Sequence, residues 1–292
     1  MAPQCAETLR VEHPDPMDQD VPPLSVSSDS AELTPDLIRG LLDGGGIATA
    51  YQPIVNVRRN SVCGWEALLR AQHGEIGAIE PVALLTAAER CGLLDAVTRR
   101  VIEDAWETVT LATDVVDEPL QVSINLELSQ FRADSELIIW LCSIAWPDQV
   151  TVIIELTERG GDEWTREHEY AAVLLEARGL RLAIDDYGAG SARMAFLHRR
   201  AWDVVKMDRQ MVRGFGERER VVIRRFVEML AELGTSSLIE GVETPEQLAA
   251  VRDLGVDYVQ GYLMGMPVPG PVMLAELRRH GLDVELGGPG LA

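Results

Sequence analysis

From residue 47 onward, short apolar runs typical of β-strands alternate with longer segments whose apolar residues recur at helical spacing. We expect strands over residues 48–55, 62–70, 120–126, 151–158, 180–188, 202–208, 237–243 and 257–263. Helices are expected between them, among others over residues 81–92, 96–111, 217–233 and 245–254. Eight strands alternating with helices predict an α/β fold, a closed parallel (β/α)8 barrel of the TIM type. An open, doubly wound sheet is the alternative, but no GxGxxG turn follows the first strand.

A further helix is expected ahead of the barrel strands. Thr34, Pro35 and Asp36 form a typical helix start, with a capping hydroxyl, a proline at the first helical position and an acidic side chain. This helix should end at the glycines 44–46. The residues before it are rich in proline, serine and acidic side chains, a composition that favours disorder. We therefore divide the chain into an acidic, disordered N-terminal tail, one barrel domain and a flexible C-terminal tail, over residues 1–33, 34–280 and 281–292.

A polar side chain stands at or near the end of each expected strand after the first. These residues are Glu66, Asn125, Glu155, Asp185, Lys206, Glu240 and Gln260. After the first interval, which spans a helical hairpin, they follow one another at about one strand–helix unit each. In a barrel the carboxyl ends of the parallel strands meet on one rim, where active sites are built. Polar strand ends scattered by chance would not show this regularity, so we interpret the set as a functional site.

Residues 180–190, LRLAIDDYGAG, contain two adjacent aspartates after an apolar run. In the middle of a strand, either Asp185 or Asp186 would face a core, because successive side chains point to opposite faces. At the end of a strand both can converge on one point, where two carboxylates repel each other unless a cation lies between them. A polar turn would explain an isolated pair equally well. The recurrence of acidic strand ends favours a cation site.

The composition narrows the classes of ligand and location. A net charge of −21 argues against binding to nucleic-acid polymers but does not exclude a small phosphorylated ligand held through metal ions. The four cysteines are far apart and form no CxxC pair, so neither a disulfide framework nor a zinc site is indicated. The sequence contains no signal-peptide pattern and no apolar run long enough to span a membrane. We therefore expect a cytoplasmic protein without membrane contact.

The expected acidic rim suits hard divalent cations such as Mg²⁺ or Mn²⁺, which prefer oxygen ligands. None of the five histidines stands at a strand end, which disfavours zinc. Five carboxylates exceed the need of one octahedral ion, and two ions about 4 Å apart serve in-line attack on a phosphodiester. Lys206 is the single lysine among 26 basic residues. Either this is an accident of composition, or the compact ammonium holds the attacking water, a task that suits it better than a planar guanidinium. Arg70 lies on the same side of its strand as Glu66 and offers a fork for a phosphate.

The segment EALLR, from Glu66 to Arg70, resembles the signature of the EAL-domain family of metal-dependent phosphodiesterases, which linearise cyclic diguanylate (cyclic di-GMP). The tripeptide alone carries little weight. Further segments match the family in order and spacing over about residues 34–275. They are YQPIV, the asparagine of SINL, IIELTE, DDYGAG, VVKMD, IEGVET and VQGYLMGMP. The chain thus resembles a stand-alone EAL protein, without an attached cyclase, sensor or receiver domain.

The resemblance implies a role for each matching residue. The implied metal ligands are Glu66, Asn125, Glu155, Asp185 and Asp186. The implied catalytic residues are Lys206 and Glu240, which would act on the nucleophilic water, together with Glu66. The residues implied to border the substrate are Gln52, Leu68, Arg70 and Gln260. Glu158 would hold the loop after the fifth strand, and the first strand would run antiparallel to the others.

The function implied by the resemblance is hydrolysis of cyclic di-GMP to the linear dinucleotide pGpG with two Mg²⁺ or Mn²⁺ ions. A homodimer is a possible oligomeric state that the sequence does not decide. The main alternative is a catalytically silent EAL domain that binds the dinucleotide or a protein as a regulator. A silent EAL domain would be recognised by the loss of a metal ligand or of the lysine, and this sequence keeps all the implied metal ligands and Lys206. A purely structural barrel would leave the acidic rim unexplained. Two departures from the family, Tyr187-Gly188-Ala189-Gly190-Ser191 after the aspartates and Glu127 after the asparagine strand end, bear on loop dynamics and dimer contacts.

Overall fold

The computed structural model describes residues 33–157, 164–188, 194–211 and 216–283. The helices in these ranges are α1 Pro35–Asp43, α2 Pro81–Arg90, α3 Leu94–Thr113, α4 Glu136–Leu141, α5 Arg166–Glu176, α6 Met194–Leu197, α7 Glu217–Glu232, α8 Pro245–Asp253 and α9 Gly270–His280, with 3-10 turns η1 Leu128–Gln130 and η2 Arg209–Met211. The strands are β1 Ile47–Asn56, β2 Ser61–His73, β3 Gly77–Ile79, β4 Leu120–Glu127, β5 Val150–Thr157, β6 Arg181–Tyr187, β7 Val204–Met207, β8 Ser236–Ile239, β9 Tyr258–Val259 and β10 Val268–Pro269.

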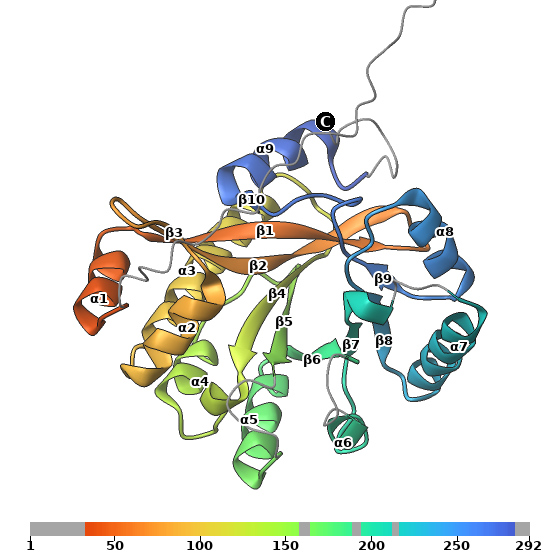
Figure 1. Ribbon diagram of the computed structural model, residues 1–292, viewed down its shortest axis with the longest axis horizontal. Coiled ribbons are helices and arrows are strands. Elements are labelled where there is room, and N and C mark those ends of the chain that lie inside the picture. The colour runs from red at the N-terminus through yellow and green to blue at the C-terminus, as the bar shows by residue number, and fades with distance from the viewer. Residues whose placement is uncertain (1–32, 158–163, 189–193, 212–215, 284–292) are drawn as a thin grey trace, which may run out of the picture. The chain divides into compact units, whose positions relative to one another are not determined.

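Eight of these strands close into a barrel (Figure 1). Around the barrel the order is β1-β9-β8-β7-β6-β5-β4-β2, and β2 pairs with β1 to complete the circle. β1 is antiparallel to both of its barrel neighbours, whereas the remaining neighbours in the barrel are parallel to each other. The two short strands β3 and β10 add antiparallel pairs to β2 and β1. The predicted barrel with an antiparallel first strand is confirmed.

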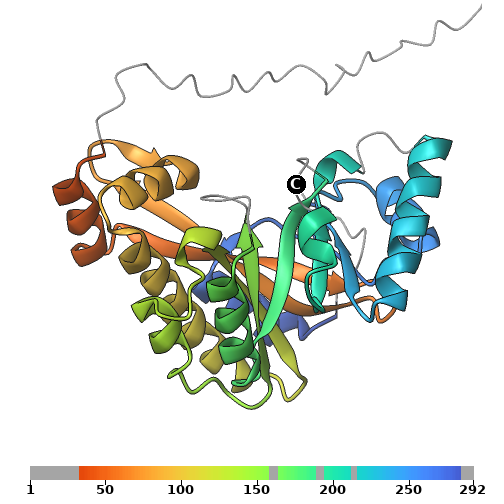
Figure 2. The ribbon, with the colours of Figure 1, turned by 90° about the horizontal axis from the view of Figure 1, so that it is seen from below.

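Helices cover the outside of the strands (Figure 2). The longest of them, α3, packs against β1, β2 and β4 through one apolar face. Its fully buried side chains recur at helical spacing and include Val97, Ile102, Ala105 and Val109. Burial of a valine or isoleucine side chain contributes about 1.5–3 kcal/mol to stability. The buried face of α3 therefore provides a large share of the apolar stabilisation between the strands and the surrounding helices.

An apolar layer fills the barrel directly below the rim. Its members include Ile54, Ile153, Ala183, Val204 and Leu238, from five strands. Four of them stand two residues before a predicted site residue, in the pairs Ile153–Glu155, Ala183–Asp185, Val204–Lys206 and Leu238–Glu240. Because side chains two apart on a strand share a face, each strand that buries an apolar residue inside the barrel raises a polar one above it. The alternation therefore places a layer of charged side chains directly above a layer of apolar side chains, which we call the dry floor.

The predicted elements match the observed ones with two kinds of difference. α1 begins where the sequence indicated, and the Thr34 hydroxyl accepts a hydrogen bond from the Leu37 N–H at 3.3 Å. The last two barrel strands are shorter than the apolar runs, because Gly241 adopts a left-handed φ of 67° just past β8 and the chain also turns away at Gly261. The strands β3 and β10 were not predicted, since two or three residues carry no readable alternation.

The predicted N-terminal tail, apart from residue 33, and the predicted C-terminal tail beyond residue 283 lie outside the described residues. The part of the C-terminal segment that is described still pairs with the barrel. The N–H of Val62 donates to the carbonyl oxygen of Leu282 at 2.8 Å, and Ser61 forms a bridge with Asp283.

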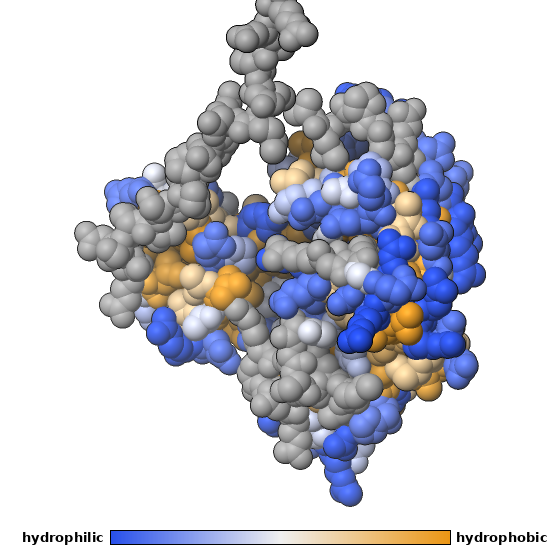
Figure 3. All heavy atoms as spheres, turned by 45° about the vertical axis from the view of Figure 1, so that its right-hand side comes forward, coloured by the Kyte–Doolittle hydropathy of each residue, from blue (hydrophilic) through white to orange (hydrophobic). Residues whose placement is uncertain are grey.

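Hydrophilic residues make up the larger part of the coloured surface in Figure 3, and hydrophobic residues form separate areas on it. This distribution agrees with the charged composition of the chain. Across the described ranges, every helix is either too short or too polar to cross a membrane.

We predict that Gly64→Ala destabilises the barrel. Gly64 pairs with Gln121 of β4, and a Cβ at this position would lie 2.2 Å from the Gln121 carbonyl oxygen. The two strands would have to separate, at a cost of about 1–3 kcal/mol in the free energy of unfolding. Urea denaturation measures this loss.

Gly40→Ala is the matched control, because a Cβ there meets nothing within 4 Å and alanine favours the helix α1. We expect this variant to be at least as stable as the wild type. Equal denaturation midpoints for Gly64→Ala and the wild type would contradict the close approach of β2 and β4.

Candidate active site

Lys206 of β7 stands at the centre of the rim. Its side chain is 1% exposed, and its Nζ lies within ion-pair distance of four carboxylates. The distances from Nζ are 2.6 Å to Glu155, 2.8 Å to Glu240, 3.1 Å to Asp185 and 3.3 Å to Glu66. These acidic residues come from β5, the end of β8, β6 and β2. The lysine therefore gathers on one point strands that are not all neighbours in the barrel.

The electrostatics of this cluster fix the charge of the lysine. Burial opposes the charged form of Lys206, but the surrounding carboxylates outweigh it and hold the pKa of the ammonium well above its usual range. Burial raises the pKa of the Glu155 carboxyl, and repulsion from Glu66 adds to this rise. Burial also raises the pKa of Glu240 to about 7. Burial acts in the same direction on Glu66, but Lys206 and two amide donors prevail and lower its pKa.

A bulge in β6 brings both aspartates to the site. The pairing with β7 shifts between Ile184 and Tyr187, and Asp186 adopts a left-handed φ of 50°. Aspartate tolerates this conformation better than most residues, and the N–H of Asp186 donates to Asp185 Oδ1 at 2.8 Å. We expected convergence because the strand would end here. The strand instead runs on to Tyr187, and the bulge cancels the alternation that would have separated the two carboxylates.

Amide side chains hold Glu66 from the other side. Asn125 Nδ2 donates to Glu66 Oε1 at 2.7 Å, and Gln260 Nε2 donates to Glu66 Oε2 at 2.8 Å. Gln260 Nε2 also lies 3.2 Å from Gln52 Oε1. Gln260 Oε1 is buried and accepts no hydrogen bond from the described residues. This amide oxygen is therefore the last atom of the network and can still accept a hydrogen bond.

The donor set fits divalent cations. Ligand oxygens of Asp185, Asp186 and Glu240 all lie within 4.8 Å of one another. With Glu66 and Glu155 the cluster contains five carboxylates against one ammonium, a formal charge of −4. Carboxylates held this close need positive charge beyond that of Lys206 to stay ionised. Oxygen donors of this number and charge are what Mg²⁺ and Mn²⁺ take.

A cavity of about 350 Å³, the rim cavity, opens above the cluster. It is lined by Gln52, Glu66, Asp186, Asp208, Arg209, Glu240, Gly241, Glu243, Gln260, Gly261 and Tyr262. A second cavity of about 210 Å³, the side cavity, lies between β2, β4 and the helices α2 and α3. It is lined by Ala67, Leu68, Leu69, Arg70, Pro81, Val82, Leu85, Val97, Thr98, Val101, Asn125, Leu126, Glu127, Gln130 and Thr157. The predicted substrate residues are thus divided between two cavities.

A sequence model of the EAL domain matches residues 36–267. The chain belongs to the EAL domain family. Two relatives of this EAL domain are the cyclic di-GMP phosphodiesterases PdeL of Escherichia coli K12 and RocR of Pseudomonas aeruginosa PAO1. PdeL is 27% identical over 248 residues, covering 84% of this chain and 68% of PdeL. RocR is 30% identical over 238 residues, covering 80% of this chain and 60% of RocR.

Among solved structures, the PaMucR phosphodiesterase in complex with c-di-GMP superposes on this EAL domain with a TM-score of 0.69 and 28% identity. The match covers 81% of this chain and 97% of that chain. Several further relatives are much longer, and the chain spans less than half of their length.

The structure brings together most of the residues singled out from the EAL-domain motifs. Lys206, Glu240 and the five predicted metal ligands lie in or next to the cluster, and Gln52 and Gln260 line the rim cavity. Leu68 and Arg70 line the side cavity, where Arg70 Nη1 donates to the Leu69 carbonyl oxygen at 2.8 Å. Glu158 lies outside the described residues.

Six lining residues of the rim cavity were not predicted: Asp208, Arg209, Gly241, Glu243, Gly261 and Tyr262. Each stands within or directly beside a quoted motif, so position in the motif was the available signal. Glu127, the departure from the family pattern, is buried at the end of β4 and lines the side cavity. We expected it to bear on loops and dimer contacts, and the structure places it beside the predicted substrate residues.

We predict that the metal-free protein becomes less stable as the pH rises from about 5 to about 7.5. Folded Glu240 keeps its proton up to about pH 7, whereas the unfolded chain loses it near the usual value of 4.5. Between these values the folded state binds more protons than the unfolded one, so stability falls with rising pH, by an amount on the order of 2 kcal/mol.

Chemical denaturation at several pH values in the presence of a chelator measures the slope. The control is Glu240→Gln, which cannot titrate and should show a smaller decline. Saturating Mn²⁺ should flatten the wild-type curve, because a bound cation favours the ionised carboxylate. Parallel curves for the metal-free wild type and Glu240→Gln would contradict the raised pKa of Glu240.

Proposed function

We propose that this EAL domain hydrolyses cyclic di-GMP to the linear dinucleotide pGpG with the help of two Mg²⁺ or Mn²⁺ ions. The observation that carries the proposal is the convergence of all the expected oxygen donors and the single lysine on one rim. The names of the relatives PdeL and RocR and the ligand of the PaMucR structure support cyclic di-GMP as the substrate.

The cluster contains enough donors for two cations. Asp185, Asp186 and Glu240 would hold one of them, and Glu66, Asn125 and Glu155 would hold the other. Glu240 belongs to the acidic rim in which the sequence predicted a cation site, and it groups with the two aspartates. The role on the nucleophilic water is what the resemblance implied for it. When bound, such a pair of ions supplies the positive charge that stabilises the attacking and leaving oxygens of a phosphodiester.

Lys206 supports the attack without serving as the base. Its pKa lies well above the usual range, so the ammonium keeps its protons at neutral pH. It can therefore donate a hydrogen bond to the oxygen of the attacking water and fix its position. The proton of that water must go to a carboxylate, and Glu240, whose carboxylate lies 2.8 Å from Nζ and thus beside the same water, would accept it.

The two cavities suit a ligand with two nucleotides. The rim cavity lies over the carboxylates, where the phosphodiester to be cleaved must lie. The side cavity is lined largely by apolar side chains, among them Leu68, Leu85 and Val101, and can cover the face of a base. Arg70 stands on its lining as a donor for the sugar–phosphate backbone.

The second candidate is a silent EAL domain that binds the dinucleotide or a protein as a regulator. The intact set of ligands and the buried lysine favour the enzyme, because hydrolysis needs the cation ligands and a group that positions the water, whereas binding alone does not need the complete set. Binding of cyclic di-GMP without any product in the presence of Mg²⁺ and Mn²⁺ would establish the silent alternative.

The direct test is incubation of the full chain with cyclic di-GMP and Mg²⁺ or Mn²⁺, with the nucleotides separated by chromatography. We expect pGpG from the wild type and no measurable product from Glu66→Ala, which lacks a metal ligand and the acceptor for Asn125 and Gln260. Glu75→Ala, an exposed glutamate in the turn after β2, is the matched control and should keep full activity. Near-normal turnover by Glu66→Ala at low metal concentration would remove Glu66 from the site.

We predict that Lys206→Arg loses most of its turnover while it still binds cyclic di-GMP. Four oxygens lie within 3.3 Å of Nζ, so the wider, planar guanidinium must move at least one carboxylate. A misplacement of about 1 Å can lower the rate on the order of 100-fold. Single-turnover hydrolysis and ligand affinity, measured side by side, separate chemistry from binding. Wild-type hydrolysis by the arginine variant would show that Lys206 only balances charge.

A further inference from the structure

Arg209 differs in charge from the other charged residues of the rim cavity. Among the described residues that line this cavity, the charged side chains are those of Glu66, Asp186, Asp208, Glu240, Glu243 and Arg209. Arg209 is the one cation in that set, against five carboxylates. Lys206 lies below them, is 1% exposed and is fully engaged by the carboxylates. An anionic ligand that enters the cavity therefore meets a single accessible positive side chain.

The backbone around Arg209 is held in place. Asp208 Oδ1 accepts a hydrogen bond from the Gln210 N–H at 2.8 Å, and the Asp208 carbonyl oxygen accepts one from the Met211 N–H at 2.9 Å. The N–H of Asp208 donates to the Tyr187 carbonyl oxygen at 3.0 Å. These bonds fix the turn η2, which begins with Arg209 directly after β7. The arginine is thus presented from a rigid element rather than from a loose loop.

Gly241 packs against the first atoms of the Arg209 side chain from the neighbouring segment. A Cβ on Gly241 would lie 2.4 Å from the Arg209 Cβ, so only glycine allows this approach. The guanidinium itself makes no ion pair and no hydrogen bond with the residues that the structure describes. An exposed arginine on a fixed turn, among five carboxylates that it does not pair with, is free to bind a ligand.

A cyclic dinucleotide carries two phosphodiesters, and only one of them can lie at the cation ligands. The other is an anion within a cavity whose charged lining residues sum to −4, and it needs a positive partner of its own. Arg70, the arginine that the sequence predicted to border the substrate, belongs to the side cavity. A guanidinium is the side chain best matched to a phosphate, because it offers two parallel N–H donors.

We propose that Arg209 binds the phosphate of cyclic di-GMP that is not cleaved. This inference rests on the proposed function and extends it to a residue that sets affinity for the dinucleotide. The contact is made equally before and during the reaction, since that phosphate does not change. Its loss should therefore raise KM and leave kcat nearly unaltered.

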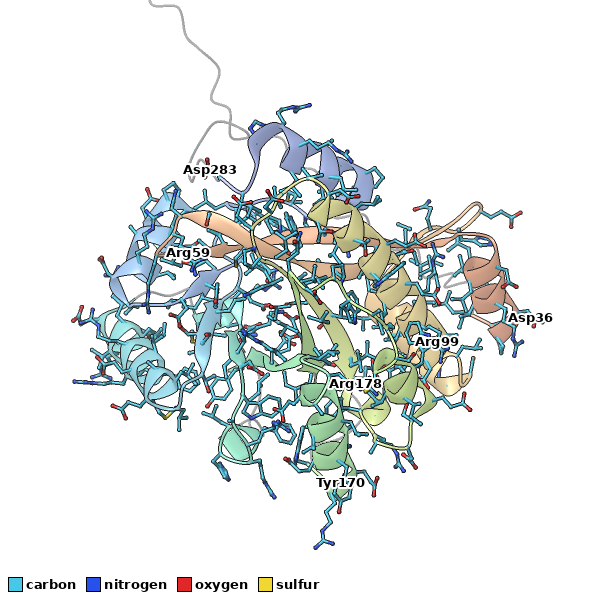
Figure 4. All side chains as sticks on the ribbon, turned by 180° about the vertical axis from the view of Figure 1, so that it is seen from behind. Asp36, Arg59, Arg99, Tyr170, Arg178 and Asp283 are labelled. Atoms are coloured by element: carbon cyan, nitrogen blue, oxygen red, sulfur yellow. The ribbon has the colours of Figure 1, made fainter. Side chains whose placement is uncertain are left out.

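The test compares Arg209→Gln and Arg209→Lys with the wild type in steady-state hydrolysis of cyclic di-GMP with Mn²⁺. Arg59→Gln is the matched control, because Arg59 is exposed in the turn between β1 and β2, where Figure 4 labels it, and lines neither cavity. We expect KM to rise about 10- to 100-fold in Arg209→Gln, the value of one charged hydrogen-bonded contact. The lysine variant should recover part of the loss, and the control should match the wild type.

Two results for Arg209→Gln would overturn the proposal. An unchanged KM would show that Arg209 does not contact the substrate. A fall in kcat with KM unchanged would place the guanidinium at the reacting phosphate instead. A wild-type protein that neither binds nor hydrolyses cyclic di-GMP would overturn the proposed function together with this inference. That failure is read from the wild type alone and is thus distinct from a failure of the arginine contact.

Discussion

The interaction on which the rim depends is the ion-pair cluster around Lys206. One buried ammonium contacts carboxylates from β2, β5, β6 and the end of β8, so the barrel must be closed and in register before the cluster can form. A buried carboxylate without a partner costs several kcal/mol, and Lys206 lowers part of this cost for each of the four carboxylates that it contacts. The fold and the site are therefore coupled through a single side chain.

The barrel makes this cluster tolerable by separating it from the apolar interior. Ile153, Ala183, Val204 and Leu238 close the barrel directly below the charged residues. Each belongs to the same strand face as the charged residue two positions later, so the period of the β-strand builds both layers. The dry floor keeps the local dielectric low, which strengthens the attraction between Lys206 and its partners and also the repulsion among the carboxylates.

The positions of most site residues could be predicted, because their spacing follows the strand–helix repeat. Glu155 and Lys206 stand near the ends of β5 and β7, as the spacing predicted, whereas Glu66 lies in the middle of β2, which runs on to His73. The pairing of Asp185 with Asp186 was predicted for an incomplete reason, since a bulge and a left-handed backbone at Asp186 bring them together. Arg209 and Tyr262 were missed because cavity walls also come from the turns after the strands, and apolar periodicity carries no information about turns.

The charges of the site explain why Lys206 alone does not complete it. The ammonium compensates one of five carboxylates, and burial, together with the remaining repulsion among the carboxylates, raises the pKa of Glu155 and of Glu240. In a metal-free protein these groups relieve the repulsion by taking up protons. Divalent cations would relieve it with the carboxylates ionised, which is the form that can accept a proton from water. The same excess of negative charge that would draw in the cations would thus also set the base for the proposed reaction. It is also the reason why we assign to Arg209 the part of an anionic substrate that the metal ions would not reach.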